Sequence, residues 1–191
     1  KYDVIATSSP LTTSLGLHTL LLTFYLGKTF TLSQNLSTLS QFQGKIGLFS
    51  VPSFVALHLS ELVTSDCSAL FCGGGQLNNK LVLQIRKLIN IPIFEFYGSS
   101  ETSFIAYQNV TKSKKLDCVG SLFPGVVFLE NTSKKVQVKS PYLFNGYIGM
   151  KPPETWETDD VGYLKNKELY LFCRRSEMID QGGNKINPIE I

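Results

Sequence analysis

A short polar segment in the middle of the chain carries side chains that could bind a phosphorylated ligand. Tyr97-Gly98-Ser99-Ser100-Glu101 joins an aromatic ring, a flexible residue, two hydroxyls and a carboxylate. Hydroxyl groups can hold phosphate oxygens, and a carboxylate can hold Mg²⁺. The same residues could instead form a polar loop that caps the next element. Taken alone, the segment leaves a phosphate site and a simple turn both open.

A second polar segment follows the only tryptophan. We interpret Trp156-Glu157-Thr158-Asp159-Asp160-Val161-Gly162 as a loop with paired carboxylates. One carboxylate can accept hydrogen bonds from two neighbouring ribose hydroxyls, although an ordinary turn ending at Gly162 has the same composition. Arg174 comes after a strand-like run and always keeps its charge, so it could bind an anion or form a surface salt bridge.

Three consecutive glycines, Gly73 to Gly75, follow a strand-like run and precede a helical one. Glycines let a ligand approach the backbone closely, and the start of the helix offers free N–H donors. The fingerprint of a dinucleotide binder is incomplete, because Asn78 stands where its third glycine would be. Glu95, 20 residues after Gly75, keeps that alternative open. A tight turn explains the glycines equally well.

The elements needed to position these segments alternate over the first half of the chain. Alternating strands and helices imply a parallel sheet with helices on both faces, and such sheets bind ligands at the carboxyl ends of their strands. The patterns predict strands at 3–8, 28–32, 45–50, 68–73 and 91–98, and helices at 11–26, 33–42, 52–63 and 76–90. We expect the first helix to be buried, because it is apolar nearly all round, and to end at Gly27.

Beyond about residue 110 the pattern changes to short strand-like runs at 119–130, 134–140 and 168–173. No long helical pattern accompanies them, so we expect a smaller antiparallel, barrel-like β unit. The fold class is therefore α/β, followed by β. The expected division is an α/β subdomain at 1–110, a β subdomain at 111–172, and a hinge with the start of a further domain at 173–191.

Composition excludes several functional classes. Hydrophobic residues make up 43% and charged residues 17%, which is enough to build a core and too apolar for a disordered chain. The net charge of +3 comes without a basic stripe, so nucleic acid is not an expected partner. No apolar run is long enough to span a membrane, and no signal-peptide pattern opens the chain, so we expect a cytoplasmic location.

The cysteines and histidines do not form a recognisable site. The four cysteines include no C-x-x-C pair, which disfavours zinc. Cys72 and Cys173 lie in apolar runs, where cysteine acts as a small core residue. His18 and His58 lie far apart in helical patterns. A Cys–His nucleophile pair is conceivable, but packed or surface histidines are favoured.

The order of these motifs resembles the adenylate-forming superfamily, which comprises acyl-CoA synthetases, non-ribosomal adenylation domains and luciferases. That family reads a Gly-Gly segment, Y-G-x-T-E, V-G-x-x-x-P-G, W-x-x-T-G-D, G-R-x-x-D-x-I, a Gly-Gly turn and P-x-E-I. This chain has Gly73 to Gly75, YGSSE at 97–101, VGSLFPG at 119–125, WETDD at 156–160, CRRSEMI at 173–179, Gly182-Gly183 and PIEI at 188–191. The resemblance covers nearly the whole chain.

The resemblance implies a role for each matching segment in binding the base and the phosphates. Gly73, Gly74 and Gly75 together with Tyr97 would sandwich the adenine, with Leu171 at its edge. Gly98 and Ser99 belong to the same nucleotide-binding segment. Ser100 stands where the family's Thr binds phosphate, and Glu101 stands where the family's Glu holds Mg²⁺.

Further roles follow for the segments near the C-terminal end. Asp160 would hold the ribose hydroxyls, assisted by Arg174. Ser176 falls at the hinge about which a small C-terminal domain swings between half-reactions. Gly182 and Gly183 fall where that domain lines the tunnel for the pantetheine arm of CoA.

Five positions depart from the family pattern. Asp159 and Cys173 each replace a Gly, and Ser176 replaces the usual Asp or Lys at the hinge. Ser100 replaces a Thr but keeps the hydroxyl. Thr13 stands at the His position of P-x-x-H, so the role of that His in the acyl pocket is lost. The family's Gly/Ser/Thr-rich phosphate loop and its catalytic Lys are both missing from this sequence, which we therefore expect to be a fragment of an AMP-forming acyl-CoA ligase.

The implied reaction is the activation of a carboxylic acid by ATP to acyl-AMP, followed by transfer of the acyl group to CoA. Its cofactors and partners would be ATP or AMP, Mg²⁺, CoA and a small carboxylic acid. An apolar first helix and the small Thr13 favour room for a fatty chain. Two alternatives remain, a carrier-protein adenylation domain and a non-catalytic nucleotide-binding module. Residues 6–14 lack the acid that amino-acid-specific domains use, and a dinucleotide-dependent oxidoreductase is disfavoured by the missing glycine.

Overall fold

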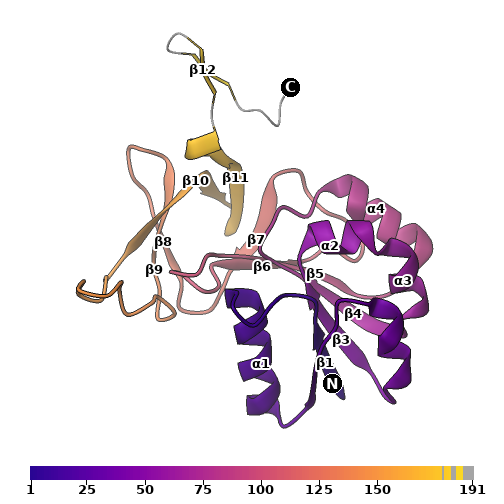
Figure 1. The fold of residues 1–191 in the computed structure, drawn as a ribbon. Helices are drawn as coiled ribbons and strands as arrows, with labels where there is room; N and C mark the ends of the chain where they lie inside the picture. Colours follow the sequence, from indigo (N-terminus) through magenta and orange to yellow (C-terminus); the bar gives the residue numbers. More distant parts are fainter. Residues whose placement is uncertain (178, 182–183, 187–191) are drawn as a thin grey trace. The chain divides into compact units, whose positions relative to one another are not determined.

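The computed structural model describes residues 1–177, 179–181 and 184–186. By its internal contacts the chain divides into two compact units (Figure 1). The first unit comprises Lys1–Ser99 with Gln108–Lys114, and the second comprises Ser100–Tyr107 with Lys115–Ile191. The expected functional boundaries at residues 110 and 172 stay a prediction.

Five parallel strands form the sheet of the first unit, in the order β2-β1-β3-β4-β5. The expected parallel pairing of the three strands near residues 45–50, 68–73 and 91–98 is confirmed. These strands have few exposed positions, which explains their continuous apolar runs. Their bounds are β1 (Val4–Thr7), β2 (Thr29–Leu32), β3 (Ile46–Ser50), β4 (Cys67–Cys72) and β5 (Ile93–Tyr97).

The helices of the first unit lie on both faces of this sheet, as the alternating pattern predicted (Figure 1). The main core packs one sheet face against residues of α3, α4 and the 3-10 helix, including Leu39, Leu62 and Ile85. A row of stacked phenylalanines crosses the opposite face, with Phe49 and Phe71 only 4.5 Å apart between ring centroids. The helices are α1 (Ser14–Leu26), η1 (Leu36–Gln41), α2 (Pro52–Leu57), α3 (Leu59–Thr64) and α4 (Asn79–Leu88).

The prediction that the first helix is buried is wrong. Helix α1 ends at Gly27, which is left-handed at φ 60°, as predicted. However, it turns its small residues inward, namely Gly16, Thr19 and Thr23, and leaves Phe24 68% exposed. The hydroxyls of Thr19 and Thr23 each donate a hydrogen bond to a backbone carbonyl one turn earlier in the helix, at 2.7 Å. Small side chains thus bring the helix close to strands β1, β2 and β3.

Three other helix predictions need correction. The single helix expected at 52–63 is broken at His58 into α2 and α3, although Pro52 begins it as predicted. The segment expected to be helical from Ser33 is a 3-10 helix that begins after Asn35, whose side chain caps it. Helix α4 is shorter than expected, because Asn78 caps it by accepting from the Leu81 N–H at 2.8 Å.

Antiparallel strands make up the second unit, as the sequence predicted. Strands β7, β11, β10, β9 and β8 follow one another in that order, and Ala106 and Tyr107 pair with β7. A short hairpin of β12 and β13 follows the 3-10 helix η2 (Arg175–Glu177). The bounds are β6 (Ala106–Asn109), β7 (Cys118–Leu122), β8 (Val127–Leu129), β9 (Lys135–Lys139), β10 (Trp156–Lys165), β11 (Glu168–Arg174), β12 (Ile179–Gln181) and β13 (Asn184–Ile186).

The interpretation of residues 156–162 as a loop is wrong, because they open the ten-residue strand β10. Its charged residues disguised it, since Asp and Glu are depleted in strands. Gly162 does not end a turn. It lies opposite Leu171 at a register shift, where an added Cβ would come within 2.5 Å of the Tyr170 carbonyl oxygen.

The inward face of α1 yields a stability prediction. A Cβ at Gly16 would lie 2.2 Å from the Pro10 carbonyl oxygen and 2.6 Å from that of Ser9. We expect Gly16→Ala to lower the free energy of unfolding by about 1–3 kcal/mol through overpacking, even though helices favour Ala over Gly by about 1 kcal/mol. Urea unfolding measures this. The matched control, Leu17→Ala on the exposed side, should change stability by only about 0.5 kcal/mol. A Gly16→Ala protein as stable as wild type would show that α1 does not pack this closely.

Candidate nucleotide site

The first set of candidate residues lies at the carboxyl edge of the parallel sheet. Strand β4 ends at Cys72 and continues into the glycines, while the adjacent strand β5 ends at Tyr97. The two strands are in parallel register, with Cys72 opposite Glu95. Gly73 to Gly75, Tyr97, Gly98 and Ser99 therefore leave neighbouring strands at the same edge of the sheet, all within the first unit.

The glycine loop is anchored at its beginning and has one special backbone conformation. The Gly73 N–H donates to the Ser50 carbonyl oxygen of the neighbouring strand end, at 3.1 Å. Gly74 has a φ of 73°, which L side chains rarely adopt, so a glycine is required there. Beyond Gly75 the chain reaches Asn78, which caps α4. The loop thus has the backbone freedom that close approach of a ring would need.

In the second unit, Glu101 is held by a residue that the sequence interpretation did not single out. The Tyr147 hydroxyl donates to Glu101 Oε1 at 2.6 Å. This hydrogen bond raises the pKa of Tyr147, with burial and the carboxylate charge adding to it. The Phe144 N–H donates to the Glu101 carbonyl oxygen at 2.8 Å. No local signal links residues 46 positions apart, so only the fold could reveal this contact.

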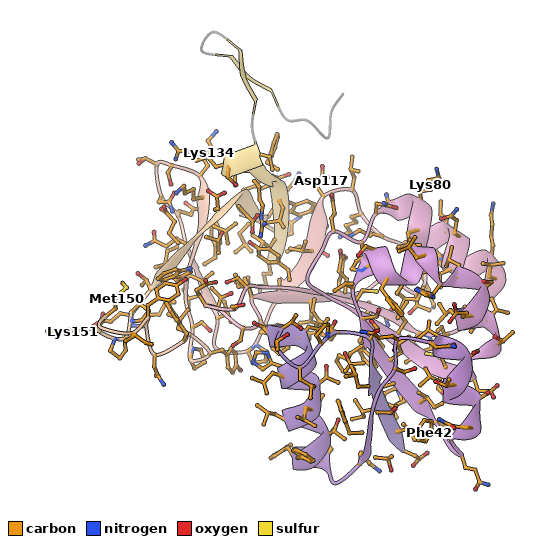
Figure 2. The ribbon with its side chains drawn as sticks, in the orientation of Figure 1. Phe42, Lys80, Asp117, Lys134, Met150 and Lys151 are labelled. Atoms are coloured by element: carbon orange, nitrogen blue, oxygen red, sulfur yellow. The ribbon has the colours of Figure 1, made fainter. Side chains whose placement is uncertain are left out.

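An aromatic cluster places Tyr147 against the start of β10. The rings of Phe144 and Trp156 meet edge to face, with their centroids 4.8 Å apart, and Tyr147 contacts both. Gly146 precedes Tyr147 with a φ of 97°, and an added Cβ would lie only 3.0 Å from the Lys151 carbonyl oxygen. The following residues turn outward, and Met150 and Lys151 lie at an outer loop of the second unit (Figure 2). The cluster therefore joins the Ser100-Glu101 segment to the strand that carries Asp160.

Asp160 and Arg174 face each other across the β10–β11 ladder. The Arg174 Nε donates to Asp160 Oδ1 at 3.1 Å, with the arginine side chain 57% exposed and the aspartate 16% exposed. The two side chains that the resemblance assigns to the ribose thus contact each other, while the assignment itself stays a prediction. Leu171, expected at the edge of the base, lies on the same strand β11 and is half-buried. An ion pair with a largely exposed arginine adds little stability by itself.

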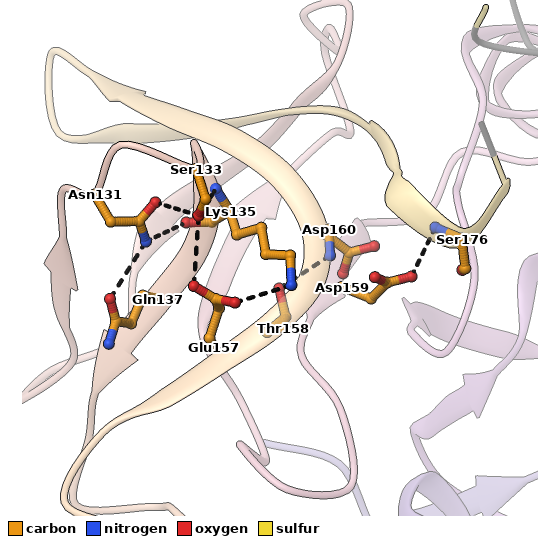
Figure 3. Close-up of polar contacts among 9 residues, drawn as sticks. All are labelled: Asn131, Ser133, Lys135, Gln137, Glu157, Thr158, Asp159, Asp160 and Ser176. Atoms are coloured by element: carbon orange, nitrogen blue, oxygen red, sulfur yellow. Dashed lines mark hydrogen bonds and ion pairs between the residues drawn. The ribbon is translucent and has the colours of Figure 1, made fainter. Parts of the chain in front are cut away.

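Neighbouring carboxylates on β10 point to different partners (Figure 3). Glu157 pairs with Lys135 at 2.9 Å, away from Asp160. Asp159 accepts a hydrogen bond from the Ser176 N–H at 3.0 Å. Asp159 and Ser176 are two of the positions at which this chain departs from the family pattern. The structure shows that these two departures contact one another.

The residues present fit a magnesium ion held through one carboxylate. No group of three or more His, Cys, Asp and Glu side chains gathers as a metal cluster in the part of the chain that the structure describes. Mg²⁺ needs only one or two carboxylates, because phosphates and water complete its octahedron. Glu101 offers such a carboxylate, and its side chain is half-buried and accepts a hydrogen bond from Tyr147.

Several predictions about single residues can be compared with the structure. The core role of Cys72 and Cys173 is confirmed, and all four cysteines are buried thiols outside any disulfide. Burial raises the pKa of the Cys72 thiol, and the nearby Glu95 charge raises it further, so it is a poor nucleophile. Thr13, at the family's His position, caps α1 by accepting from the Gly16 N–H at 3.2 Å. Within the described residues, no helix is long and apolar enough to cross a membrane.

The candidate residues belong to two different units. The first unit holds the glycines, Tyr97, Gly98 and Ser99, whereas the second holds Ser100, Glu101, Asp160, Leu171 and Arg174. Their convergence on one nucleotide stays a prediction. Gly182, Gly183 and the PIEI segment at 188–191 lie outside the described residues.

Comparison with known proteins places the chain in a family. The chain is 32% identical over 200 residues to VraA of Staphylococcus haemolyticus, named as a long chain fatty acid-CoA ligase, with 96% of this chain and 43% of the relative covered. It is 31% identical to the 2-succinylbenzoate–CoA ligase of Lactococcus lactis, with 78% of this chain and 35% of the relative covered. No family model matches the chain.

Solved structures agree on the fold. MenE of Bacillus subtilis, an o-succinylbenzoate-CoA synthetase solved in complex with AMP, superposes with a TM-score of 0.82 at 24% identity, covering 98% of this chain and 44% of that one. MenE of E. coli gives a TM-score of 0.82 at 23% identity, covering 99% and 43%. The fold is therefore that of the adenylate-forming enzymes. By sequence the chain belongs to their acyl-CoA ligases, and it spans under half the length of the curated relatives that it matches.

The contact between Asp159 and Ser176 yields a pH prediction. Hydrogen bonds from the Ser176 side chain and backbone lower the pKa of Asp159. A pKa below the unfolded value of about 3.9 means that this contribution is complete above that pH and is lost as the pH falls through the folded pKa. Between about pH 6 and pH 3, we expect the free energy of unfolding of wild type to fall by more than that of Asp159→Asn. Urea unfolding at each pH measures this. The difference should be small because Asp159 is exposed. Parallel stability curves for the two proteins would contradict the assignment.

Proposed function

We propose that the protein activates a carboxylic acid with ATP and transfers the acyl group to CoA. In the first step a carboxylate oxygen attacks the α-phosphorus, forming acyl-AMP and releasing pyrophosphate. In the second step the CoA thiol attacks the acyl carbon, forming the thioester and releasing AMP. The relatives support this reaction, since both are named as CoA ligases. The structural observation that carries it is the Asp160–Arg174 pair on adjacent strands.

The roles of the residues follow from their chemistry. Asp160 can accept hydrogen bonds from two ribose hydroxyls while Arg174 holds its Oδ1 in place. Ser100 would donate to the α-phosphate. Glu101 would hold Mg²⁺, which supplies charge neutralisation on the phosphates when bound. In such reactions the protein mainly positions groups and balances charge, and these residue types suit that task.

The base would lie between the glycine loop and Tyr97, with Leu171 at its edge and Gly98 and Ser99 beside the sugar and phosphate. The open backbone at Gly74 and the half-buried Tyr97 ring support this assignment. For the acid, we propose a fatty or similarly apolar acid. The name of the Staphylococcus haemolyticus relative supports a fatty acid, and the small Thr13 at the head of α1 leaves space that a His would fill.

The full-length protein should convert a mixture of carboxylic acids, ATP and CoA into acyl-CoA, identified by mass analysis. Asp160→Asn should raise the KM for ATP by about 10- to 100-fold, because hydrogen bonds to a charged group contribute about 1.5–3 kcal/mol. The matched control is Glu157→Gln on the same strand, whose carboxylate faces Lys135 instead. It should leave KM nearly unchanged. Equal behaviour of the two variants would contradict the role of Asp160, and no acyl-CoA from any acid would contradict the function.

Residues 1–191 alone should bind adenosine nucleotides weakly and without turnover. This sequence holds the residues assigned to adenosine but no glycine-rich phosphate loop ending in Lys. Positioning contributes roughly 7–11 kcal/mol to catalysis only when all groups are in place. We therefore expect AMP to bind about as tightly as ATP in calorimetric titration, with no pyrophosphate released. Turnover, or a strong preference for ATP, would mean that these residues hold the triphosphate themselves.

A further inference from the structure

A buried carboxylate lies beneath the glycine loop, and the function proposed above does not use it. Glu95, in the middle of β5, is only 3% exposed. Its Oε2 pairs with the ammonium group of Lys114, whose side chain is 7% exposed, and accepts from the Gln108 amide at 2.6 Å. Its Oε1 accepts from the Leu77 N–H at 3.2 Å. All four residues belong to the first unit.

Stability alone does not explain this pair. Taking a carboxylate and an ammonium group out of water costs several kcal/mol each, and apolar residues of similar volume often serve as well or better. Leu77, whose N–H bonds to Glu95, belongs to the apolar core of the first unit together with Ile85 and Ile93, and all three are fully buried. The buried charge of Glu95 therefore needs an explanation other than stability. Its hydrogen-bond partners indicate what that explanation is.

Glu95 fixes the far end of the glycine loop. The loop begins at Gly73, which the sheet holds through the Ser50 carbonyl oxygen. Between Gly73 and Gly75 no side chain is present to anchor the backbone. Leu77 is the next residue to be fully buried, and its N–H points to the Glu95 carboxylate. The loop is thus tied to β3 at one end and to β5 at the other.

Tyr97, the other candidate for contacting the base, is two residues beyond Glu95. Side chains two apart on a strand point to the same face, so Glu95 lies below Tyr97 on the side of the sheet that carries the loop. Gln108 and Lys114 hold the other carboxylate oxygen, Oε2, and so oppose rotation of Oε1 away from the Leu77 N–H. A single charged group therefore sets the spacing between the two segments assigned to the adenine.

We propose that Glu95, held by Lys114 and Gln108, is a positioning residue for nucleotide binding. It touches no substrate, because it is buried, and it acts by fixing the glycine loop relative to Tyr97. This inference rests on the proposed function. It predicts that the acceptor oxygen at position 95 matters for the nucleotide and that the charge matters only because Lys114 is there.

Two double variants separate these contributions in the full-length protein. Glu95→Leu with Lys114→Met removes both charges and the acceptor, and replaces them by apolar side chains of similar size. Glu95→Gln with Lys114→Met also removes both charges but keeps an oxygen for the Leu77 N–H. Both proteins should fold, since neither leaves an unpaired buried charge. The readouts are AMP affinity by calorimetry, the steady-state constants for ATP and acid, and amide hydrogen exchange of residues 74–77.

We expect the Leu/Met protein to bind AMP about tenfold more weakly and to show a KM for ATP raised by about the same factor, with kcat and the KM for the acid nearly unchanged. Its amides at 74–77 should exchange faster with solvent. The Gln/Met protein should bind AMP within about threefold of wild type, which is a rescue that a purely structural role would not require.

A folded Leu/Met protein with wild-type AMP affinity, or a Gln/Met protein as impaired as the Leu/Met one, overturns the positioning role. Wild-type protein decides the proposed function separately. If it forms acyl-CoA but the variants do not differ, only the present inference fails. If wild type neither binds AMP nor activates any acid, the proposed function fails and takes the positioning role with it, whatever the hydrogen exchange shows.

Discussion

The parallel pairing of β4 with β5 is the constraint on which the first unit depends. Because the strands run in the same direction, their carboxyl ends meet at one edge, and each end passes directly into a candidate segment. Parallel strands need both faces covered, and α4, the helix that follows the glycines, supplies part of that cover with Leu81, Val82 and Ile85. The loop that carries the candidate chemistry is therefore also the connection that buries the sheet. A change that loosened α4 would move the glycines with it.

In the second unit the candidate carboxylates near Trp156 lie within a strand, whereas the candidate segments of the first unit follow the ends of strands. Glu157, Asp159 and Asp160 are close together in β10, but the register of the strand shifts between Glu157 and Val161, and the three acids have different partners. Glu157 and Asp159 are bound by Lys135 and Ser176, and the register shift near Gly162 brings Asp160 opposite Arg174. The backbone ladder, rather than salt bridges, holds this arrangement, because the ion pairs on it are exposed and individually weak.

The sequence predicted an element correctly where its local pattern matches its surroundings in the folded protein. The buried strands β3, β4 and β5 show continuous apolar runs because both their faces are covered, and Pro52 and Gly27 begin and end helices for stereochemical reasons that act locally. Prediction failed for α1, because a helix that is apolar nearly all round does not show which of its sides is buried. The buried side proved to be the one with Gly16, where only a glycine fits. Prediction also failed for β10, whose polar composition hides a strand.

The candidate site was predictable in its residue types but not in the groups that hold them. Tyr147 and Lys114 are distant in sequence from the carboxylates that they contact, so no spacing rule could pair them. The contact between Asp159 and Ser176 was equally hidden, and it joins two positions at which this chain departs from the family pattern. Considered singly, each replaces a usual residue with no evident reason. Together they form one hydrogen bond, in which the carboxylate satisfies the N–H of Ser176 in the 3-10 turn that ends β11. A glycine at 159 would leave that N–H to water, so the contact gives the acid at 159 a structural reason, whereas any residue except proline at 176 would supply the same N–H.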